Sequence, residues 1–509
     1  MSATVQSIIS SGTSGTIVDI ECSLSNNLPN IIIVGFANKA VGEAKERIRG
    51  AFADSRIMLP RKRITVNLAP ADIPKADSGF DLAIAMSILL ASEQIPAIVT
   101  KKQAFIGELG LDGSTRAVRG IIGKLLAGRA KGITTFYIPK ANLGQAQLVP
   151  RVTLLTVENL RQLYEHYHGI VQITPVNTGV GKRKVAPTKR ADHGVKLSEV
   201  IGQAQAKRAL EIAAAGGHNV FFSGPPGTGK SMLAKALPSI LPPLNREETL
   251  EVTHLHSLAS HNYEQIITAR PFRAPHHSAS HVAITGGGLS LRPGEISLAH
   301  RGVLFFDELP EFERVTLEAL RQPLEDRLIS IARAKETAEF PANFILVATA
   351  NPCPCGYYGT SGTCRCLPYQ ITRYQQRLSG PILDRIDLYS SVHEVQHDKL
   401  LTRTADQETD IAVRRRILAA RRIQAKRFNA PGKLNADMTN TDSKRHGQLE
   451  PEATALLNTA AQHLNISARA YMRTVKVART IADLENSPVI TPAHISEALA
   501  YRRPPAPNE

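Results

Sequence analysis

The sequence predicts an α/β protein with about three domains, and three observations support this class. The chain has 509 residues, and globular domains average roughly 150 residues. Short β-branched runs alternate with helical stretches over most of the chain, while the C-terminal part has helical spacing alone. A strand at 219–223 runs into a glycine-rich loop and then a helix, which is the order of a phosphate-binding P-loop.

The composition favours a globular protein with a polyanionic partner. Hydrophobic residues make up 43% of the chain and charged residues 21%, which argues against wholesale disorder. Lys and Arg number 61 against 45 Asp and Glu, so the net charge is +16 and suggests nucleic acid or an acidic membrane surface. No apolar run reaches the roughly 18–20 residues of a spanning helix, and residues 1–20 carry no secretory signal pattern. We therefore expect a cytoplasmic protein without a membrane segment.

Residues 1–170 are expected to form an N-terminal α+β domain. Apolar periodicity there alternates between the two-residue repeat of strands and the longer repeat of helices. The expected strands are 30–35, 63–67 and 134–139, and the expected helices are 39–52, 82–92 and 121–130.

Residues 171–195 are expected to be an exposed basic linker. They are rich in Pro, Gly and Thr, carry Lys182, Arg183, Lys184, Lys189 and Arg190, and have no hydrophobic period. A solvated tether and a direct contact to nucleic acid both fit this pattern.

Residues 196–398 hold the recognisable chemistry, and residues 399–509 are expected to form a helical domain. Apolar spacing of three and four residues marks helices at 411–426, 451–463 and 469–485. Thr491 and Pro492 have the pattern of an N-cap followed by proline in the first helical turn, so a final helix is expected there.

The P-loop pattern G-x-x-x-x-G-K-S lies between a predicted strand and a predicted helix, the context that such a motif requires. Backbone N–H groups of a glycine-rich loop and the N-terminus of the following helix bind phosphates. Lys230 is placed to reach the β and γ oxygens of a nucleotide, and Ser231 to bind Mg²⁺. The predicted nucleotide-binding residues of this loop are Gly224, Pro225, Pro226, Gly227, Thr228, Gly229, Lys230 and Ser231.

A second strand at 302–306 ends in two carboxylates, which is the Walker B pattern. We expect Asp307 to hold the Mg²⁺ shell and Glu308 to orient and activate the attacking water. An acidic pair on a surface loop is the alternative, which the upstream P-loop disfavours.

Three further polar residues fall where a nucleotide site would use them. Asn351 follows a predicted strand at 344–348 and could position water against the γ-phosphate. Arg385 could touch the nucleotide of a neighbouring subunit, and Arg469 could close over the phosphates from the helical lid. Ordinary surface positions remain the alternative for each, because arginine is common on surfaces.

Four of the five cysteines form the pattern C-x-C-x8-C-x-C. Four thiolates suit tetrahedral Zn²⁺, and a metal stabilises a short loop that has no core of its own. The spacing differs from the usual C-x2-4-C, so reduced cytosolic thiols are the alternative. The candidate zinc ligands are Cys353, Cys355, Cys364 and Cys366.

Taken together, the segments PFRAPHHS (271–278), GVLFFDELPEF (302–312), LRQPLEDRLISIARA (320–334) and NPCPCG (351–356) resemble the YifB/ComM family of magnesium-chelatase-like AAA+ ATPases over nearly the whole chain. The resemblance implies ATP and Mg²⁺ as cofactors, a homo-hexameric ring, and a DNA helicase that promotes branch migration when transforming DNA is integrated. It also implies that Asn351 is sensor 1, Arg385 the arginine finger and Arg469 sensor 2, and it makes Arg377 a further candidate to act in trans. A remodelling ATPase that acts on a protein or a metal-chelatase complex is the alternative.

The N-terminal domain resembles the Lon-protease fold through FIGELG (105–110) and the segment at 116–142. In that alignment Asp81 stands where the nucleophilic serine would be, and Ile122 occupies the lysine position, with Lys124 two residues later. Because a Ser–Lys dyad needs both groups within hydrogen-bond reach, we expect a proteolytically inactive collar that forms the ring or contacts DNA.

Seven histidines lie between the two Walker motifs, in a region that carries a pore-facing hairpin insertion in the resembling branch. Arg273, His276 and His277 are therefore candidates to face a nucleic-acid backbone, with Gly286–Gly288 as a flexible tip. Local hydrogen bonds or a subunit interface are the alternative. The seven are His254, His256, His261, His276, His277, His281 and His300.

Overall fold

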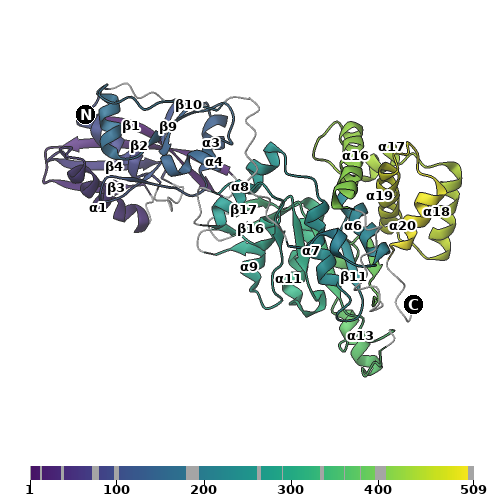
Figure 1. Ribbon diagram of the computed structural model, residues 1–509. Coiled ribbons are helices and arrows are strands. Elements are labelled where there is room, and N and C mark those ends of the chain that lie inside the picture. Colours follow the sequence, from purple (N-terminus) through teal and green to yellow (C-terminus); the bar gives the residue numbers. More distant parts are fainter. Residues whose placement is uncertain are drawn as a thin grey trace.

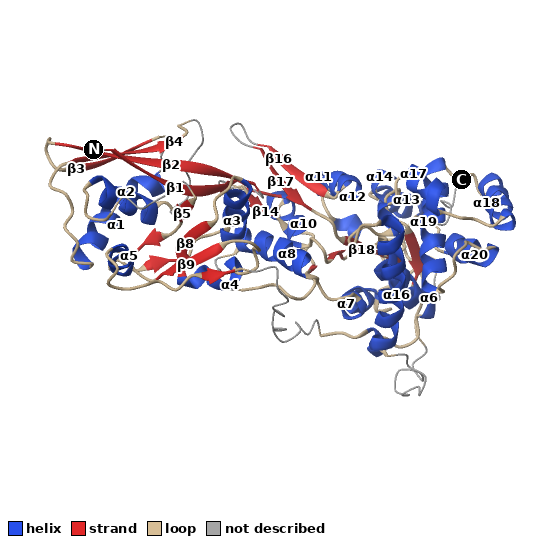
Figure 2. Cartoon of the chain, turned by 90° about the horizontal axis from the view of Figure 1, so that it is seen from above, coloured by secondary structure: helices blue, strands red, loops and turns tan. Residues whose placement is uncertain are grey.

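The structure is a computed structural model, and it describes most of the chain. Figures 1 and 2 show an elongated molecule with the N-terminal domain at one end and the C-terminal helices at the other. The described residues are 2–11, 14–35, 39–71, 79–96, 102–178, 194–260, 265–288, 291–332, 337–359, 362–378, 380–395 and 409–502.

The N-terminal domain is built on a mixed eight-stranded sheet with the order β10-β9-β8-β5-β1-β2-β4-β3. Strands β1 and β2 form a long antiparallel hairpin in its middle, and β3, β5, β8 and β9 run parallel to a neighbour. The strands are β1 (Ser2–Ser11), β2 (Ser14–Ser25), β3 (Asn30–Val34), β4 (Arg63–Ala69), β5 (Gln103–Phe105), β8 (Thr135–Pro139), β9 (Thr153–Val157) and β10 (Val176–Asn177).

Both faces of this sheet are covered, because side chains alternate along β1. Ile9 faces the core around α2 and Ile8 faces the core around α3. Helix α2 is buried on all sides, which explains why its sequence shows an apolar run rather than an amphipathic period. The helices are α1 (Lys39–Asp54), α2 (Asp81–Ala91), α3 (Ile121–Ala130), α4 (Leu143–Ala146) and α5 (Leu160–Tyr167).

The second sheet has five strands in the order β12-β15-β18-β11-β19, all parallel to their neighbours. Alternate residues of its apolar strands face two different cores: Phe222 belongs to one and Phe221 to the other. Helices therefore cover both faces, as parallel sheets require. The strands are β12 (Phe272–Arg273), β15 (Val303–Phe306), β18 (Ile345–Ala350), β11 (Val220–Ser223) and β19 (Leu388–Ser391).

The helices of this domain lie between and after its strands. Among the described residues there are also three short hairpins, one in the N-terminal domain and two in this domain. The helices are α6 (Ala204–Gly216), α7 (Lys230–Ile240), α8 (Arg246–Ala259), α9 (His281–Thr285), α10 (Glu295–Leu298), α11 (Arg314–Ala319), α12 (Arg321–Asp326), α13 (Pro368–Gln376) and α14 (Gly380–Leu383). The hairpins pair β6 (Glu108–Leu109) with β7 (Thr115–Arg116), β13 (Gly286–Gly287) with β14 (Arg292–Pro293), and β16 (Leu328–Ala332) with β17 (Thr337–Pro341).

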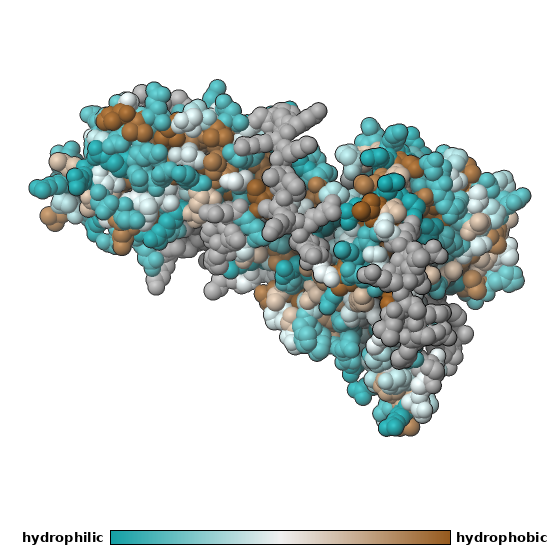
Figure 3. All heavy atoms as spheres, in the orientation of Figure 1, coloured by the Kyte–Doolittle hydropathy of each residue, from teal (hydrophilic) through white to brown (hydrophobic). Residues whose placement is uncertain are grey.

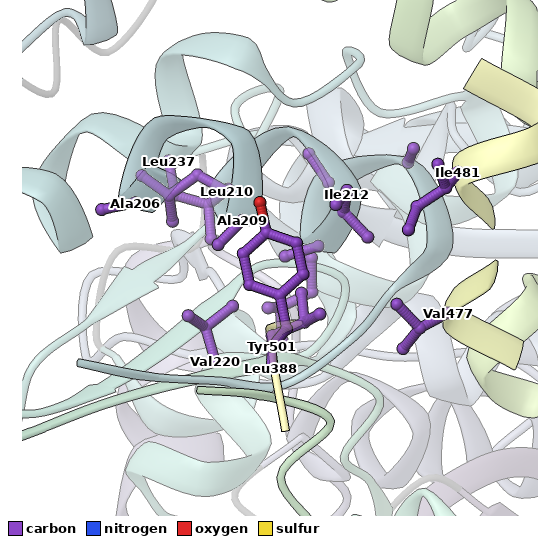
Figure 4. Close-up of a cluster of buried hydrophobic side chains, with 14 of the residues drawn as sticks. Ala206, Ala209, Leu210, Ile212, Val220, Leu237, Leu388, Val477, Ile481 and Tyr501 are labelled. Atoms are coloured by element: carbon purple, nitrogen blue, oxygen red, sulfur yellow. The ribbon is translucent and has the colours of Figure 1, made fainter. Parts of the chain in front are cut away.

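The C-terminal helices share one core with the five-stranded sheet. Figure 4 shows Val477 and Ile481 of α19 close to α6, with Val220 and Leu388 of the sheet nearby. Because one core spans both segments, the helical region is packed directly on the five-stranded sheet. Its helices are α16 (Asp410–Phe428), α17 (Asn440–His446), α18 (Pro451–His463), α19 (Ala468–Leu484) and α20 (Pro492–Ala500).

One expected boundary shifts in the structure. Val176 and Asn177 form β10, which pairs with β9, so the first residues of the expected linker at 171–195 belong to the N-terminal sheet. The side chain of Thr178 accepts a hydrogen bond from the Val152 backbone, which continues this edge. The basic residues of the linker lie outside the described residues.

A membrane span requires a long, apolar helix. Hydrophilic and hydrophobic residues are interspersed over the face seen in Figure 3. Within the described ranges, no helix has the length and apolar character needed to cross a membrane.

Candidate nucleotide site

The P-loop connects the end of β11 to the start of α7, as the sequence predicts. Gly227 and Gly229 have φ of +79° and +88°, a region that residues with a side chain rarely adopt, so the loop can curl only with glycine at these positions. A Cβ on Gly224 would lie 2.2 Å from the Val392 carbonyl oxygen, so this glycine lets the loop pass close to the end of β19.

Lys230 points back into the loop. Its Nζ donates hydrogen bonds to the carbonyl oxygens of Gly224 and Pro225, both at 2.7 Å, and to Oδ1 of Asn351 at 3.1 Å. Burial lowers the pKa of Lys230, while the charges of Asp307 and Glu308 oppose that shift. The ammonium is thus held at the loop by neutral oxygens, and it can exchange these acceptors for phosphate oxygens.

Ser231, Asp307 and Glu308 meet beside the P-loop, at the C-terminal ends of the parallel strands. Ser231 Oγ donates a hydrogen bond to Asp307 Oδ2 at 2.9 Å. A hydroxyl and a carboxylate in contact are hard oxygen ligands of the kind that Mg²⁺ takes when it also binds phosphates. Glu308 has a left-handed backbone with φ of +53°, an uncommon conformation for a residue with a side chain.

Thr349 is the residue of this site that the sequence reasoning missed. Its Oγ1 donates to Asp307 Oδ1 at 2.6 Å and accepts from the Glu308 N–H at 3.0 Å, and the residue is fully buried. Thr349 therefore fixes the Asp307 carboxylate and the backbone of Glu308. The sequence does show a hydroxyl residue near the end of the next strand after the Walker B strand. Its role could not be predicted, because it depends on the pairing of β15 with β18.

Arg385 and Arg469 lie together, but not at the P-loop. Both pair with Glu325 of α12, at 2.5 Å and 2.6 Å. The carbonyl oxygen of Arg385 accepts a hydrogen bond from Asn219, which immediately precedes β11, whereas the P-loop follows the other end of that strand. Four residues of strand span about 13 Å. The two arginines thus lie near the end of β11 that is opposite to the P-loop and to Lys230 of the same chain.

These arginines border an open cavity of about 680 Å³. Arg473 and Lys476 of α19 also line it, together with the carboxylates of Glu325, Asp384 and Asp387. Arg377 lies elsewhere and pairs with Glu311 at 3.1 Å.

The four cysteines come together as the sequence pattern suggests. All four sulfur atoms lie within 4.8 Å of one another. Cys353 Sγ is 3.3 Å from Cys355 Sγ and 3.8 Å from Cys364 Sγ. Zn–S bonds of about 2.3 Å in a tetrahedron place sulfur atoms about 3.8 Å apart, so the cluster fits one zinc ion. Backbone N–H groups of Tyr357 and Arg365 lower the pKa of Cys355 to about 6, whereas burial and the neighbouring thiols raise the pKa of Cys364 and Cys366.

The histidine-rich region has a mainly structural role where the structure describes it. His254 is buried, His256 contacts the Leu298 carbonyl oxygen, and His300 bridges Glu251 and the Asn343 backbone. Local packing and hydrogen bonds therefore account for these three. His276 and His277 are exposed and their rings lie 4.1 Å apart, His281 is partly exposed, and His261 lies outside the described residues.

Arg273, one of the candidates to face a nucleic acid, lies in β12 at the edge of the five-stranded sheet. Its guanidinium forms two 2.5 Å contacts with the Glu295 carboxylate, which comes from a helix 22 residues later in the chain. Gly286 and Gly287, expected as part of a flexible tip, form β13, which pairs with β14 in a small hairpin.

Asp81 and Lys124 of the N-terminal domain are both buried. Asp81 pairs with Arg47 at 2.7 Å, and Lys124 lies fully buried in α3, the helix that also carries Ile122. Burial raises the pKa of Asp81 to about 6, against the opposing effect of Arg47.

A P-loop, an acidic strand end and a packed helical lid on a five-stranded parallel sheet define a P-loop ATPase of the AAA+ class. Comparison with protein families finds a match for each of the three parts of the chain. Residues 20–142 match "Subunit ChlI of Mg-chelatase", residues 196–400 match "Magnesium chelatase, subunit ChlI", and residues 407–502 match its C-terminal region.

Relatives match over almost the whole chain. The competence protein ComM of Haemophilus influenzae is 44% identical over 98% of this chain and 97% of its own length. YifB of Escherichia coli is 42% identical over 95% and 94%, and Rv2897c of Mycobacterium tuberculosis is 38% identical over 97% of each chain. The chain belongs to the magnesium chelatase ChlI-like family of AAA+ ATPases and is similar to ComM and YifB within it.

Proposed function

We propose that this protein is an ATP-driven hexameric motor that moves DNA, and that it acts as a helicase in branch migration during recombination or natural transformation. The observation that carries the ATPase part is the contact network of Lys230, Ser231, Asp307 and Asn351 at one sheet edge. The net charge of +16 and the similarity to a competence protein support DNA as the partner.

In this proposal the residues at the P-loop edge divide the work. Lys230 binds the β and γ oxygens, Ser231 and Asp307 hold Mg²⁺, and Glu308 activates water. Asn351 touches Lys230 and is placed to orient that water. Mg²⁺ supplies charge neutralisation on the phosphates when it is bound.

The positions of Arg385 and Arg469 support a ring in which these residues act between subunits. Each arginine lies near the end of the parallel strands that is opposite to the P-loop of its own chain. A nucleotide that these arginines touch therefore belongs to a neighbouring subunit. The Glu325 carboxylate holds both guanidinium groups side by side and lowers their net charge. A hexamer with sites at its interfaces follows as the proposed assembly.

The remaining parts have supporting roles in this proposal. The N-terminal domain has a Lon-protease-like fold without protease activity, since Asp81 and Ile122 replace the dyad and Asp81 is engaged by Arg47. It acts as a collar of the ring. Zn²⁺ is the ion we propose for the four cysteines.

DNA-stimulated ATP hydrolysis is the test of this function. We expect single-stranded or forked DNA to raise the ATPase rate, and Lys230→Ala to abolish it. Because phosphate contacts release counterions, the logarithm of DNA affinity should fall linearly with the logarithm of salt concentration. A rate unaffected by DNA, together with binding that does not respond to salt, contradicts the DNA motor.

A remodelling ATPase that acts on a protein or a metal-chelatase complex is the second candidate. The match to magnesium chelatase subunit models over all three parts of the chain favours it. ATP hydrolysis that is insensitive to DNA but stimulated by a partner protein would support this function.

A further inference from the structure

The four cysteines belong to a segment that returns to the nucleotide site at both ends. This segment, which we call the cysteine module, comprises residues 351–376, of which 351–359 and 362–376 are described. It begins at Asn351, directly after β18, and ends with α13, which lies at the lower tip of the molecule in Figure 1. Its exposed side chains include Tyr357, Tyr358 and Tyr369.

The module touches the P-loop at Gly356. This glycine is buried and has φ of +88°, and a Cβ built on it would lie 2.5 Å from Cδ and 2.7 Å from Cγ of Pro226. Pro226 is the middle of the P-loop. Gly356 follows Cys355 directly, and its N–H donates to the Cys353 carbonyl oxygen at 3.0 Å. The turn that carries two metal ligands is therefore packed on the phosphate-binding loop.

The module also holds Asn351 from its other end. Gln375 of α13 donates a hydrogen bond to the Pro352 carbonyl oxygen at 3.3 Å, and Tyr374 is hydrogen-bonded to the Asn351 backbone. Asn351 in turn accepts the hydrogen bond from Lys230. Because α13 starts two residues after Cys366, the cysteines control where this helix lies.

We propose that Zn²⁺ bound by Cys353, Cys355, Cys364 and Cys366 is a structural part of the nucleotide site, so that zinc binding and nucleotide binding strengthen each other. The inference rests on the proposed nucleotide site. The module buries few side chains of its own, so the metal is needed to hold Gly356 against Pro226 and α13 against Asn351. Two ligands that stabilise the same arrangement raise each other's affinity by the same factor.

The test uses the full-length protein with its zinc content measured by elemental analysis and its nucleotide affinity by a fluorescent ATP analogue. We expect about one zinc per chain, since one tetrahedral ion takes four thiolates. The variant with Cys364→Ser and Cys366→Ser should lose zinc and weaken nucleotide binding by about tenfold or more. In the unmodified protein, ATP should slow the release of zinc to a chromogenic chelator.

Two glycine variants distinguish the loss of the contact with the P-loop from a general defect of the cysteine module. Gly356→Ala should keep its zinc and weaken nucleotide binding, because the new Cβ displaces Pro226. Gly359→Ala introduces a side chain at a similar φ of +71° but meets nothing within 4 Å, so its nucleotide affinity should stay at the unmodified level. Circular dichroism of each variant verifies that it is folded.

Two results overturn the inference, and a third concerns only the proposed function. Protein purified without zinc, or a zinc-free folded variant that binds nucleotide as the unmodified protein does, refutes the linkage. Nucleotide binding that persists in Lys230→Ala refutes the nucleotide site itself. If Lys230→Ala loses binding while zinc removal has no effect, the nucleotide site stands and only the linkage fails.

Discussion

At the scale of single residues, Thr349 has the most specific role in the candidate site. It is the one hydroxyl that contacts both the Asp307 carboxylate and the Glu308 backbone in the described part of the chain. Replacing it by valine keeps the shape but removes both hydrogen bonds in a buried place, which costs about 1–3 kcal/mol of the free energy of unfolding.

We predict that Thr349→Val lowers the ATPase rate by about 10- to 100-fold, because small misplacements of catalytic groups have effects of this size. Nucleotide affinity should change little, since Lys230 keeps its contacts. Steady-state hydrolysis and analogue binding measure the two quantities. Thr349→Ser restores the hydroxyl and should recover most of the rate; equal loss in both variants would contradict this role.

Asp81 leads to a prediction about pH and stability. Burial raises its pKa from 3.8 to about 6 in the folded protein. Between these values the folded state binds more protons than the unfolded state, so this residue's contribution to stability falls as pH rises. The difference of about 2 units corresponds to about 3 kcal/mol at full effect.

Asp81→Asn should therefore gain stability relative to the unmodified protein as pH rises from 4 to 6.5. Denaturant unfolding at several pH values measures this relative change, which cancels the titration of other groups. If the difference between the two proteins stays constant over this range, Asp81 does not titrate as the structure indicates.

At the scale of elements, the contact between α3 and α8 joins the N-terminal domain to the ATPase domain. His254 of α8 is buried against Gly123 of α3, where a Cβ would lie 2.5 Å from the imidazole ring. Neither ring nitrogen of His254 has a hydrogen-bond partner among the described residues, and burial lowers its pKa to about 4. Close packing, rather than charge, makes this contact.

We predict that Gly123→Ala destabilises the protein by about 1–3 kcal/mol, the usual cost of overpacking. In a His254→Ala background, where the space is open, the same change should instead stabilise by up to about 1 kcal/mol because alanine favours the helix. Thermal or denaturant unfolding of the unmodified protein, the two single variants and the double variant gives the free energies of this double-mutant cycle. Equal effects of Gly123→Ala in both backgrounds would mean that the two residues do not interact.

At the scale of the whole molecule, the separation of Lys230 from Arg385 determines how a ring would work. A site with its P-loop in one chain and its arginines in the next can be completed by two different defective subunits. We predict that Arg385→Ala binds nucleotide but hydrolyses little, and that Lys230→Ala binds none.

Mixing the two inactive variants should restore part of the ATPase activity. At interfaces where an Arg385→Ala subunit binds nucleotide, a Lys230→Ala neighbour supplies the intact arginine. Activity of the mixture is measured against each variant alone at the same total concentration. A mixture as inactive as its components shows that Arg385 acts within its own chain or that the subunits do not assemble.

The sequence alone predicted the elements that follow local rules. Strands and helices such as β11 and α3 were predicted closely, because apolar periodicity repeats within a few residues. The P-loop could be predicted because its phosphate-binding residues are eight consecutive residues between a strand and a helix. The hairpin of β16 and β17 was not predicted.

Local sequence patterns were thus enough to predict the α/β class, the P-loop, the Walker B carboxylates and the grouping of four cysteines, because each is encoded by neighbours in the chain. The contacts of Thr349 with the Walker B pair, of Glu325 with Arg385 and Arg469, and of Gly356 with Pro226 became visible only in the folded chain. The physical reason is that these contacts depend on strand order and on the close approach of distant segments, which no local pattern records.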